Sequence, residues 1–196
     1  MDSSKARRKY LRLMWEVEKR LEVLNGFISG EIDSLYLLAT IESEALQLRK
    51  ILELIAFASL VTHKEAYESV RKDILKDWHA KRIMRKVENL NPDFYPIPTV
   101  GVRNGKWQNL RGGFLTRKQF ESLYDRCGNI LHAKNPFSKV SQHTLSFHNS
   151  VPDYVARIEM LLRDHRVRLI GARDEIRVSV PFFSQERIKI WFLTKV

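Results

Sequence analysis

The sequence predicts a mainly α-helical fold, an antiparallel helical bundle followed by a small C-terminal antiparallel β extension. Over most of residues 5–165 the apolar residues recur every three or four positions, which is the period of a helix packed on one side. From Val167 onward the period changes to two, as in strands. The chain has 196 residues, of which 44% are hydrophobic, enough for one core. We therefore expect a helical domain over residues 1–165 and a strand extension over residues 166–196.

Two long helices open the chain. Residues 5 to about 28 carry one apolar stripe, and residues 31 to about 61 carry a wider one that covers more than one face. Because the connection between them is short, we expect an antiparallel hairpin with the second helix buried at the centre. The second stripe comprises Leu35, Leu38, Ile41, Ala45, Leu48, Leu52 and Ile55.

Capping signals predict the next two helices. Thr62 and Glu65 form a capping box that starts a third helix. Asp77 is placed to cap a fourth, running from Trp78 to about Glu88. The prolines that follow, in NPDFYPIP, remove backbone donors and force the chain out of helix.

The second half of the chain alternates turns and helices. The pair Asn104-Gly105 predicts a β-hairpin near residues 99–110, inserted into the helical domain. A second capping box, Thr116 with Gln119, predicts a helix over residues 117–134. A further helix is expected to begin after Ser150, with Pro152 in its first turn. Three antiparallel strands then correspond to VRLIG, EIRVSVPF and RIKIWFLTKV.

The charge indicates a polyanionic partner. There are 34 Lys and Arg residues against 23 Asp and Glu, a net charge of +11. Cations near a phosphate chain release condensed counterions, so nucleic acid is the expected partner, and a merely soluble basic protein is the alternative. No acid occurs between Asp93 and Glu121. The candidate nucleic-acid-binding residues of that tract are Arg103, Lys106, Arg111, Arg117 and Lys118. Trp107 among them either stacks on a base or packs on its own domain.

Several classes of protein are excluded by what the sequence lacks. The single cysteine, Cys127, rules out an internal disulfide and a cysteine-based zinc cluster. The N-terminus has no apolar signal region and no apolar run approaches a membrane span, so a cytoplasmic location without membrane contact is expected. The sequence has no glycine-rich phosphate loop, no GxSxG and no HExxH, so we expect neither a nucleotide triphosphatase nor a serine hydrolase. The histidines are too scattered to indicate a metal site, and no cofactor is expected. His165, which lies among arginines, is expected at the surface or on a phosphate.

One polar helix face is a candidate site. On the helix over residues 117–134, Arg126, Asn129 and His132 follow at spacings of three, opposite the expected core side. Asp125 falls within the same arc. A solvated face with no function is the alternative.

The segment Arg-Cys-Gly-Asn-Ile-Leu-His at residues 126–132 resembles the HEPN signature, an Arg followed by a His after four to six residues. The segments QLRKILELIAFASL, DWHAKRIMRKVENLNPDFYP and YDRCGNILHAKNPF are also similar to uncharacterised bacterial HEPN-like proteins. The resemblance covers most of residues 31–165. It implies a helical bundle of HEPN type that forms a homodimer, with two motifs facing one cleft. In active members the residue after the Arg is usually polar, whereas here it is Cys127.

The resemblance implies a metal-independent endoribonuclease, with Arg126 and His132 as catalytic residues and Asn129 assisting them. Histidine exchanges protons near neutral pH, and a guanidinium binds phosphate oxygens in pairs. Glu42, Arg49 and Glu53 lie within about 40° of each other on the central helix. In one interpretation this charged stripe, together with Asp125, supports the site by orienting His132. In the other, Arg49 and Glu53 only form an ion pair within their own helix.

Two functions remain open from the sequence. The first is an endoribonuclease of a toxin–antitoxin or phage-defence type, with RNA as substrate and an antitoxin or defence-complex protein as partner. The second is a non-catalytic helical module that dimerises and binds nucleic acid or a partner subunit. Gly128 is costly inside a helix, which predicts the close approach of another backbone, from the core or from a second subunit.

Overall fold

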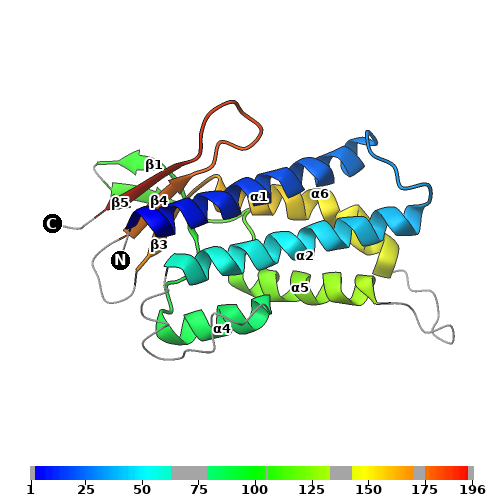
Figure 1. The fold of residues 1–196 in the computed structure, drawn as a ribbon, viewed down its shortest axis with the longest axis horizontal. Helices are drawn as coiled ribbons and strands as arrows, with labels where there is room; N and C mark the ends of the chain where they lie inside the picture. The colour runs from blue at the N-terminus through cyan, green and yellow to red at the C-terminus, as the bar shows by residue number, and fades with distance from the viewer. Residues whose placement is uncertain (1–2, 63–78, 105, 133–142, 170–174, 194–196) are drawn as a thin grey trace.

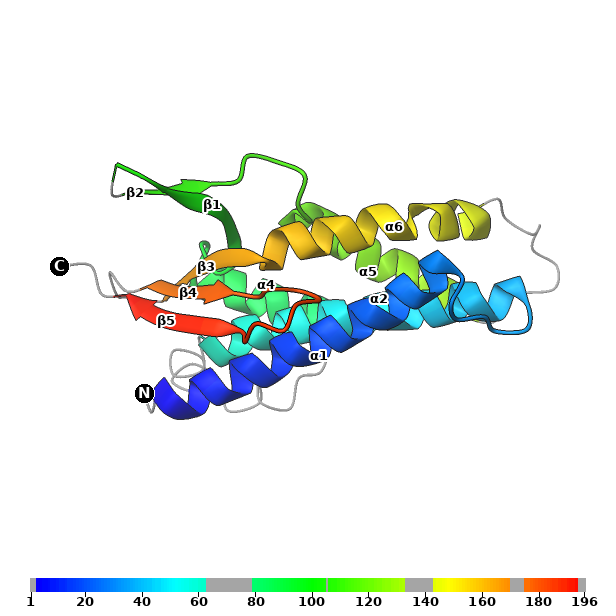
Figure 2. The same cartoon turned by 90° about the horizontal axis from the view of Figure 1, so that it is seen from above.

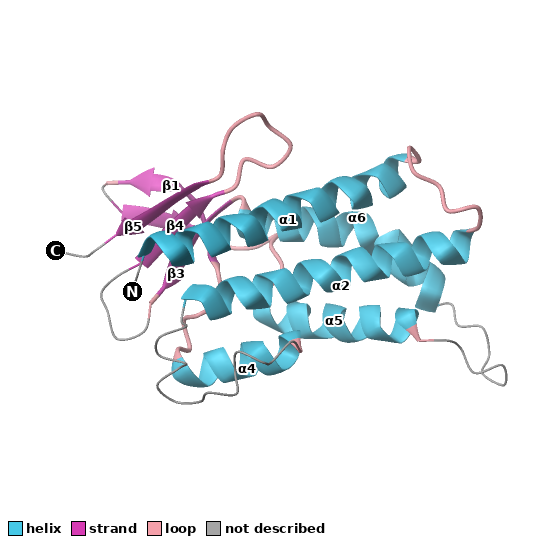
Figure 3. Ribbon diagram, in the orientation of Figure 1, coloured by secondary structure: helices cyan, strands magenta, loops and turns pink. Residues whose placement is uncertain are grey.

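The computed structural model describes residues 3–62, 79–104, 106–132, 143–169 and 175–193. The described part is mainly helical, with a small antiparallel sheet at one end of the helices (Figures 1 and 3). Its helices are α1 (Ser3–Ser29), α2 (Leu37–Thr62), α4 (Ala80–Leu90), α5 (Arg117–Leu131) and α6 (His143–Leu162). Its strands are β1 (Ile97–Arg103), β2 (Lys106–Asn109), β3 (Asp164–Arg168), β4 (Glu175–Ser179) and β5 (Lys189–Leu193).

The predicted hairpin of long helices is confirmed by α1 and α2, which lie side by side and antiparallel (Figure 1). The predicted start of the second helix was too early. Leu35 has a left-handed backbone, with φ of 57°, and a continuous helix cannot pass through such a residue. The connection instead folds back on α1, where the Ile32 side chain lies so close to Gly26 that a Cβ there would come within 2.5 Å of it.

The predicted buried stripe on the second helix is correct only from Ile41 onward. The five residues from Ile41 to Ile55 in that stripe are at most 1% exposed. Leu35, in the connection before α2, is fully exposed, and Leu38, in the first turn of α2, is 45% exposed. An apolar end of the bundle therefore remains at the surface of the chain.

The capping box of Thr116 and Gln119 is confirmed at the start of α5, where both reciprocal hydrogen bonds form. This helix ends at Leu131, so His132 follows it in extended conformation instead of lying on its face as predicted. The capping residues Glu65 and Asp77 and the start at Trp78 fall outside the described residues. The helix expected there is seen from Ala80, with His79 at the N-cap.

The predicted start of the last helix, after Ser150, was wrong. α6 begins at His143 and carries Pro152 in its interior. Phe147 and Val151 before the proline, and Val155 after it, are all buried at helical spacing. Packing of this continuous apolar stripe outweighs the loss of one backbone hydrogen bond at Pro152.

The strands form one antiparallel sheet in the order β2-β1-β3-β4-β5. The predicted hairpin is present, and strands lie in all three C-terminal segments, although β3 begins at Asp164, three residues before the predicted start at Val167. The hairpin and the C-terminal strands join through β1 and β3, where Ile97 pairs with Arg166. The sheet thus draws strands from both sides of the expected domain boundary at residue 165. An irregularity between Thr99 and Val102, next to Gly101 at φ of 115°, twists the hairpin out of the plane of the other strands.

One face of the sheet packs against α1. Ile176, Val178 and Ile190 are buried there. His165 is also completely buried on this face, so its predicted place at the surface was wrong. Its Nδ1 donates to the carbonyl of Leu162 at 2.8 Å, and its Nε2 accepts from the Tyr10 hydroxyl at 2.7 Å. Burial lowers the pKa of His165 to about 4, so this imidazole is neutral.

Within the described residues, no helix combines the length and the apolar character that crossing a bilayer requires.

Candidate functional site

Arg126 of α5 is a half-buried cation held by aromatic rings. Its Nη1 donates to the Tyr154 hydroxyl on α6. The guanidinium carbon lies 5.7 Å from the ring centre of Phe147 and 5.5 Å from that of Tyr154. Among the described residues, no carboxylate lies within ion-pair distance of Arg126. The guanidinium is therefore fixed in position by α6 and keeps its charge available for an anion.

The other residues of the predicted polar face do not converge on Arg126. Asn129 and His132 are exposed, and neither side chain makes a hydrogen bond in the part of the chain that the structure describes. Asp125 turns to the opposite flank of α5, where Lys81 of α4 donates to it at 2.7 Å. Arg126 thus faces α6 and Asp125 faces α4, whereas Asn129 and the post-helical His132 face solvent.

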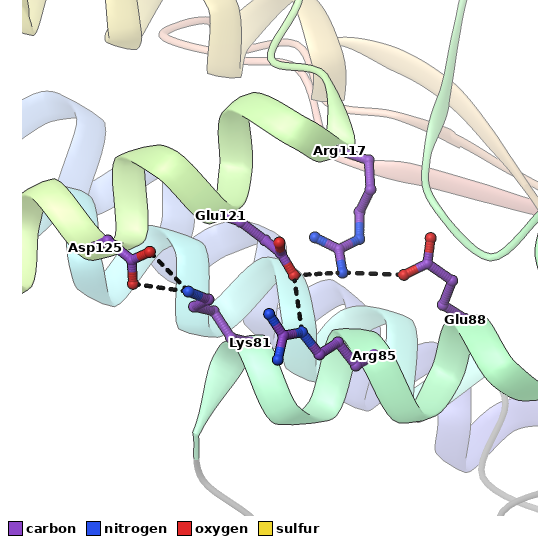
Figure 4. A network of polar contacts seen from close by, with 6 residues as sticks. All are labelled: Lys81, Arg85, Glu88, Arg117, Glu121 and Asp125. Carbon is purple, nitrogen blue, oxygen red and sulfur yellow. Dashed lines mark hydrogen bonds and ion pairs between the residues drawn. The ribbon is translucent and has the colours of Figure 1, made fainter.

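Asp125 belongs to a network of ion pairs between α4 and α5 (Figure 4). Glu121 accepts from Arg85 at 3.3 Å and from Arg117 at 3.0 Å, and Arg117 also donates to Glu88 at 3.1 Å. Burial by itself would raise the pKa of Glu121, but the guanidinium groups of Arg117 and Arg85 outweigh it and lower the pKa. Arg117 therefore already has two carboxylate partners, which a phosphate would have to displace.

The charged stripe of α2 faces α5. Arg49 pairs with Glu53 at 3.4 Å, donates to the Tyr124 hydroxyl at 3.1 Å and lies with its guanidinium carbon 4.5 Å from the Tyr124 ring centre. Lys50 also pairs with Glu53, at 3.0 Å. Glu42, by contrast, is exposed and makes no polar contact with another described side chain.

Gly128 leaves room for Arg49. A Cβ at residue 128 would lie 3.1 Å from Nη1 of Arg49. Within the chain the close neighbour is therefore a side chain and not a backbone from the core, and the approach of a second subunit stays a prediction. Cys127 beside it points into the core, where burial raises the pKa of its thiol to about 12 in spite of the nearby Arg49 and Arg126. Burial thus favours the neutral thiol over the thiolate.

A buried pair that sequence analysis missed joins α2 to α6. Nδ1 of His148 lies 2.8 Å from Oε2 of Glu44, whose side chain is 1% exposed. Burial raises the pKa of Glu44, and the hydrogen bond and charge of His148 lower it in part. A signal was present, because Glu44 falls beside Ile41, Ala45 and Leu48 on the buried side of its helix. No comparable pattern in the sequence identified its partner, His148, which lies 104 residues away.

Four of the predicted nucleic-acid-binding residues are exposed cations, namely Arg103, Lys106, Arg111 and Lys118. None of them forms an ion pair with another described residue. They follow the chain from the β1–β2 hairpin, through the next loop, to the first turn of α5. The hairpin and this loop lie on the side of the molecule away from α1 (Figure 2). This segment therefore presents a run of unneutralised positive charge.

Comparison of the chain with protein-family models, with curated proteins and with solved structures found no match.

Proposed function

We propose that the protein binds RNA and cleaves it without a metal, as an endoribonuclease of HEPN type that acts in a toxin or phage-defence role. The observation that carries the proposal is Arg126, a positioned guanidinium with aromatic neighbours and no carboxylate partner among the described residues. Such a group suits a phosphate, which it contacts with two parallel hydrogen bonds. The run of exposed cations from Arg103 to Lys118 supports an RNA substrate.

The proposed reaction uses a neighbouring hydroxyl of the RNA as its nucleophile. His132 removes the proton of the 2′-hydroxyl, the 2′-oxygen attacks phosphorus, and the bond from phosphorus to the 5′-oxygen breaks. The leaving oxygen takes a proton from a second imidazole, and a 2′,3′-cyclic phosphate remains. Arg126 offsets the charge that gathers on the phosphorus oxygens. Exposure of His132 leaves it accessible to a substrate.

A second copy of the chain would supply the second His132. The bundle end formed by the α1–α2 connection exposes several large apolar side chains, which is typical of an interface. These are Ile28, Ile32, Leu35, Tyr36, Leu37 and Leu38, each at least 39% exposed. The C-terminal end of α5, which precedes His132, lies at the same end of the bundle (Figure 1). A homodimer through this end would bring two His132 side chains toward each other, and an antitoxin or defence-complex partner would compete for the same surface.

The test is cleavage of total cellular RNA in EDTA. Wild type is expected to cut and to leave 2′,3′-cyclic ends, and His132→Ala to lose about 10²–10⁴-fold in rate. Arg126→Ala is expected to lose rate strongly, and Arg126→Lys not to restore it, because an ammonium lacks the fork of donors. His143→Ala, a change at another exposed histidine, is the matched control and should cut normally. Cleavage that needs a divalent metal and survives His132→Ala would refute the proposal.

The second candidate is a non-catalytic module that dimerises and binds nucleic acid or a partner subunit. The observation that favours it is the separation of the predicted catalytic residues, because Asn129 and Asp125 do not face Arg126. This function predicts RNA binding without cleavage, at equal affinity in wild type and His132→Ala.

A further inference from the structure

The outer face of the sheet, away from α1, carries tryptophan and arginine side chains in register across neighbouring strands. Trp191 of β5 pairs with Arg177 of β4, which pairs with Arg166 of β3. Because side chains alternate along a strand, these residues share a face opposite to buried Ile176, Val178 and Ile190. The register therefore lines up one aromatic ring and two guanidinium groups across the sheet.

The twisted hairpin adds a second tryptophan to this face. Trp107 of β2 lies over Arg177, with the guanidinium carbon 3.5 Å from the ring centre. The same carbon lies 5.5 Å from the ring centre of Trp191. Both indole rings thus lie against the guanidinium of Arg177, although β1, β3 and β4 separate their strands, β2 and β5, in the sheet. A register shift next to Gly101 lies in this hairpin, where a bulge increases the local twist, and Trp107 near the end of the hairpin contacts Arg177 of β4.

The side chains of this cluster are held in place by ion pairs. Arg177 donates to both carboxylate oxygens of Asp164, at 2.8 and 3.1 Å. Arg166 pairs with Glu175 at 2.8 Å. Arg177 is therefore a positioning residue that fixes the two indoles. The acids on the face are neutralised, and the excess charge comes from Arg103 and Lys106 on the hairpin, which pair with no acid among the described residues.

Apolar surface at this cluster faces solvent, most of it on the Trp191 ring. Trp191 is 41% exposed and its neighbour Leu193 is 37% exposed. Trp107 is half-buried, with Arg177 against its ring. Unstacked bases pack on such rings, whereas the bases of a duplex are already stacked and paired. Arg103 and Lys106 pair with each other at the turn of the hairpin, one position along from Val102 and Trp107. Because side chains alternate along a strand, these two cations project from the opposite face of the hairpin to the indole, at its outer end.

We propose that this face, defined by Trp107, Arg177 and Trp191, binds single-stranded nucleic acid, with bases stacked on the indoles and with the strand continuing past the turn of the hairpin, where Arg103 and Lys106 contact its phosphates. The inference deepens the proposed function, because it names the part of the protein that would hold the RNA strand. It assigns binding to the sheet and leaves the proposed chemistry at α5.

The experiment measures binding of a fluorescent oligothymidylate of about twelve nucleotides by anisotropy. DNA lacks the 2′-hydroxyl, so the proposed cleavage cannot consume the probe. Trp191→Ala is expected to weaken binding about tenfold, and Trp191→Phe to retain most of the affinity. Trp15→Ala is the matched control, because Trp15 is 54% exposed on α1 and also has a cation, Lys19, 5.9 Å from its ring. That variant should bind as wild type does.

The outcomes separate this inference from the proposed function. Affinity unchanged in Trp191→Ala, or a duplex preferred over the single strand, would overturn the inference even if the wild type cleaves RNA. Tryptophan-dependent binding by a protein that cleaves no RNA in EDTA would sustain the inference and reject the nuclease. Absence of any oligonucleotide binding would overturn the inference, and the cleavage assay in EDTA would decide separately on the nuclease.

Discussion

At the scale of single residues, the strand period decides the chemistry of His165. The arginines on either side of it in sequence, Arg163 and Arg166, suggested a cationic surface. In a strand, however, neighbours point to opposite faces, and His165 shares its face with Val167. The information was present in the alternation of residues 164–168. The partner, Tyr10, was not predictable, because it lies 155 residues away.

We expect the stability of the fold to fall as the pH is lowered from about 6.5 toward 4. The pKa of His165 is about 4 in the folded protein, against an ordinary value of 6.5, so the unfolded chain binds the proton first. Neutral His165 makes its full contribution to the free energy of unfolding above pH 6.5. By pH 4 the loss of that contribution amounts to about 3 kcal/mol. Urea unfolding between pH 4 and 8 measures it. His165→Gln should flatten the curve, whereas His143→Ala should leave it unchanged; equal curves for wild type and His165→Gln would contradict this account.

The Glu44–His148 pair gives a second prediction at this scale. His148→Ala should destabilise the protein by about 1–3 kcal/mol, because it removes the partner of a carboxylate that is almost fully buried. Glu44→Gln combined with His148→Ala should cost less than His148→Ala alone, since no buried charge then remains. Chemical denaturation compares the variants. Glu42→Gln, on an exposed side chain of the same helix, is the control and should have almost no effect.

At the scale of elements, local sequence signals predicted that the helices exist better than they predicted where each helix ends or which element its side chains contact. The capping box of α5 is local and was identified correctly. The end of α5 at Leu131 and the passage of α6 through Pro152 depend on tertiary packing, which a short window of sequence does not contain. The placement of Arg126 and Asp125 on the same side of α5 was also correct, but it did not predict which helix each side chain contacts. The side chains separate because α6 offers a hydroxyl on one flank and α4 offers an ammonium on the other.

The network between α4 and α5 predicts that two adjacent cations have different roles. Arg117→Ala should destabilise the protein by about 1–2 kcal/mol, since it removes two ion pairs and the contacts with the Phe94 and Phe120 rings. Lys118→Ala, on an exposed side chain, should leave stability within about 0.5 kcal/mol. For oligonucleotide affinity we expect the reverse, so that Lys118→Ala weakens binding more than Arg117→Ala does. Thermal unfolding and anisotropy on both variants test this, and a larger loss of affinity for Arg117→Ala at unchanged stability would contradict it.

At the scale of the whole molecule, the helical bundle with a small sheet followed from the sequence, but the arrangement of the sheet did not. Each strand was visible in the alternation of its residues. The pairing of β1 with β3 joins segments that are separated by two helices, and no local pattern specifies such a contact. The net charge could likewise be read from the sequence. The pairing of Arg117 with Glu88 and of Arg177 with Asp164 could not, because these acids lie on other elements of the fold.

The remaining exposed cations predict the salt dependence of binding. Arg103, Lys106, Arg111 and Lys118 would neutralise up to about four phosphates of a single strand. The logarithm of the association constant should then fall with the logarithm of salt concentration at a slope of about −3. Replacing Arg103 and Lys106 by Gln should reduce the steepness by about 1.4. Anisotropy titrations at several salt concentrations measure the slope, and a flat dependence would show that the charge does not contact phosphate.

The contact between Tyr10 and His165 also has a consequence for the order in which the chain assembles. A ribosome adds roughly 5–20 residues per second, and 155 residues separate Tyr10 from His165. His165 is therefore synthesised about 8–30 seconds after Tyr10. During that interval α1 and α2 can pair, because their contacts are local, while β1 has only β2 beside it and exposes an open edge. The nascent protein therefore passes through a stage with a formed helical hairpin and an unprotected strand. Chaperones that cover strand edges would act in this window, and the arrival of β3 would close it.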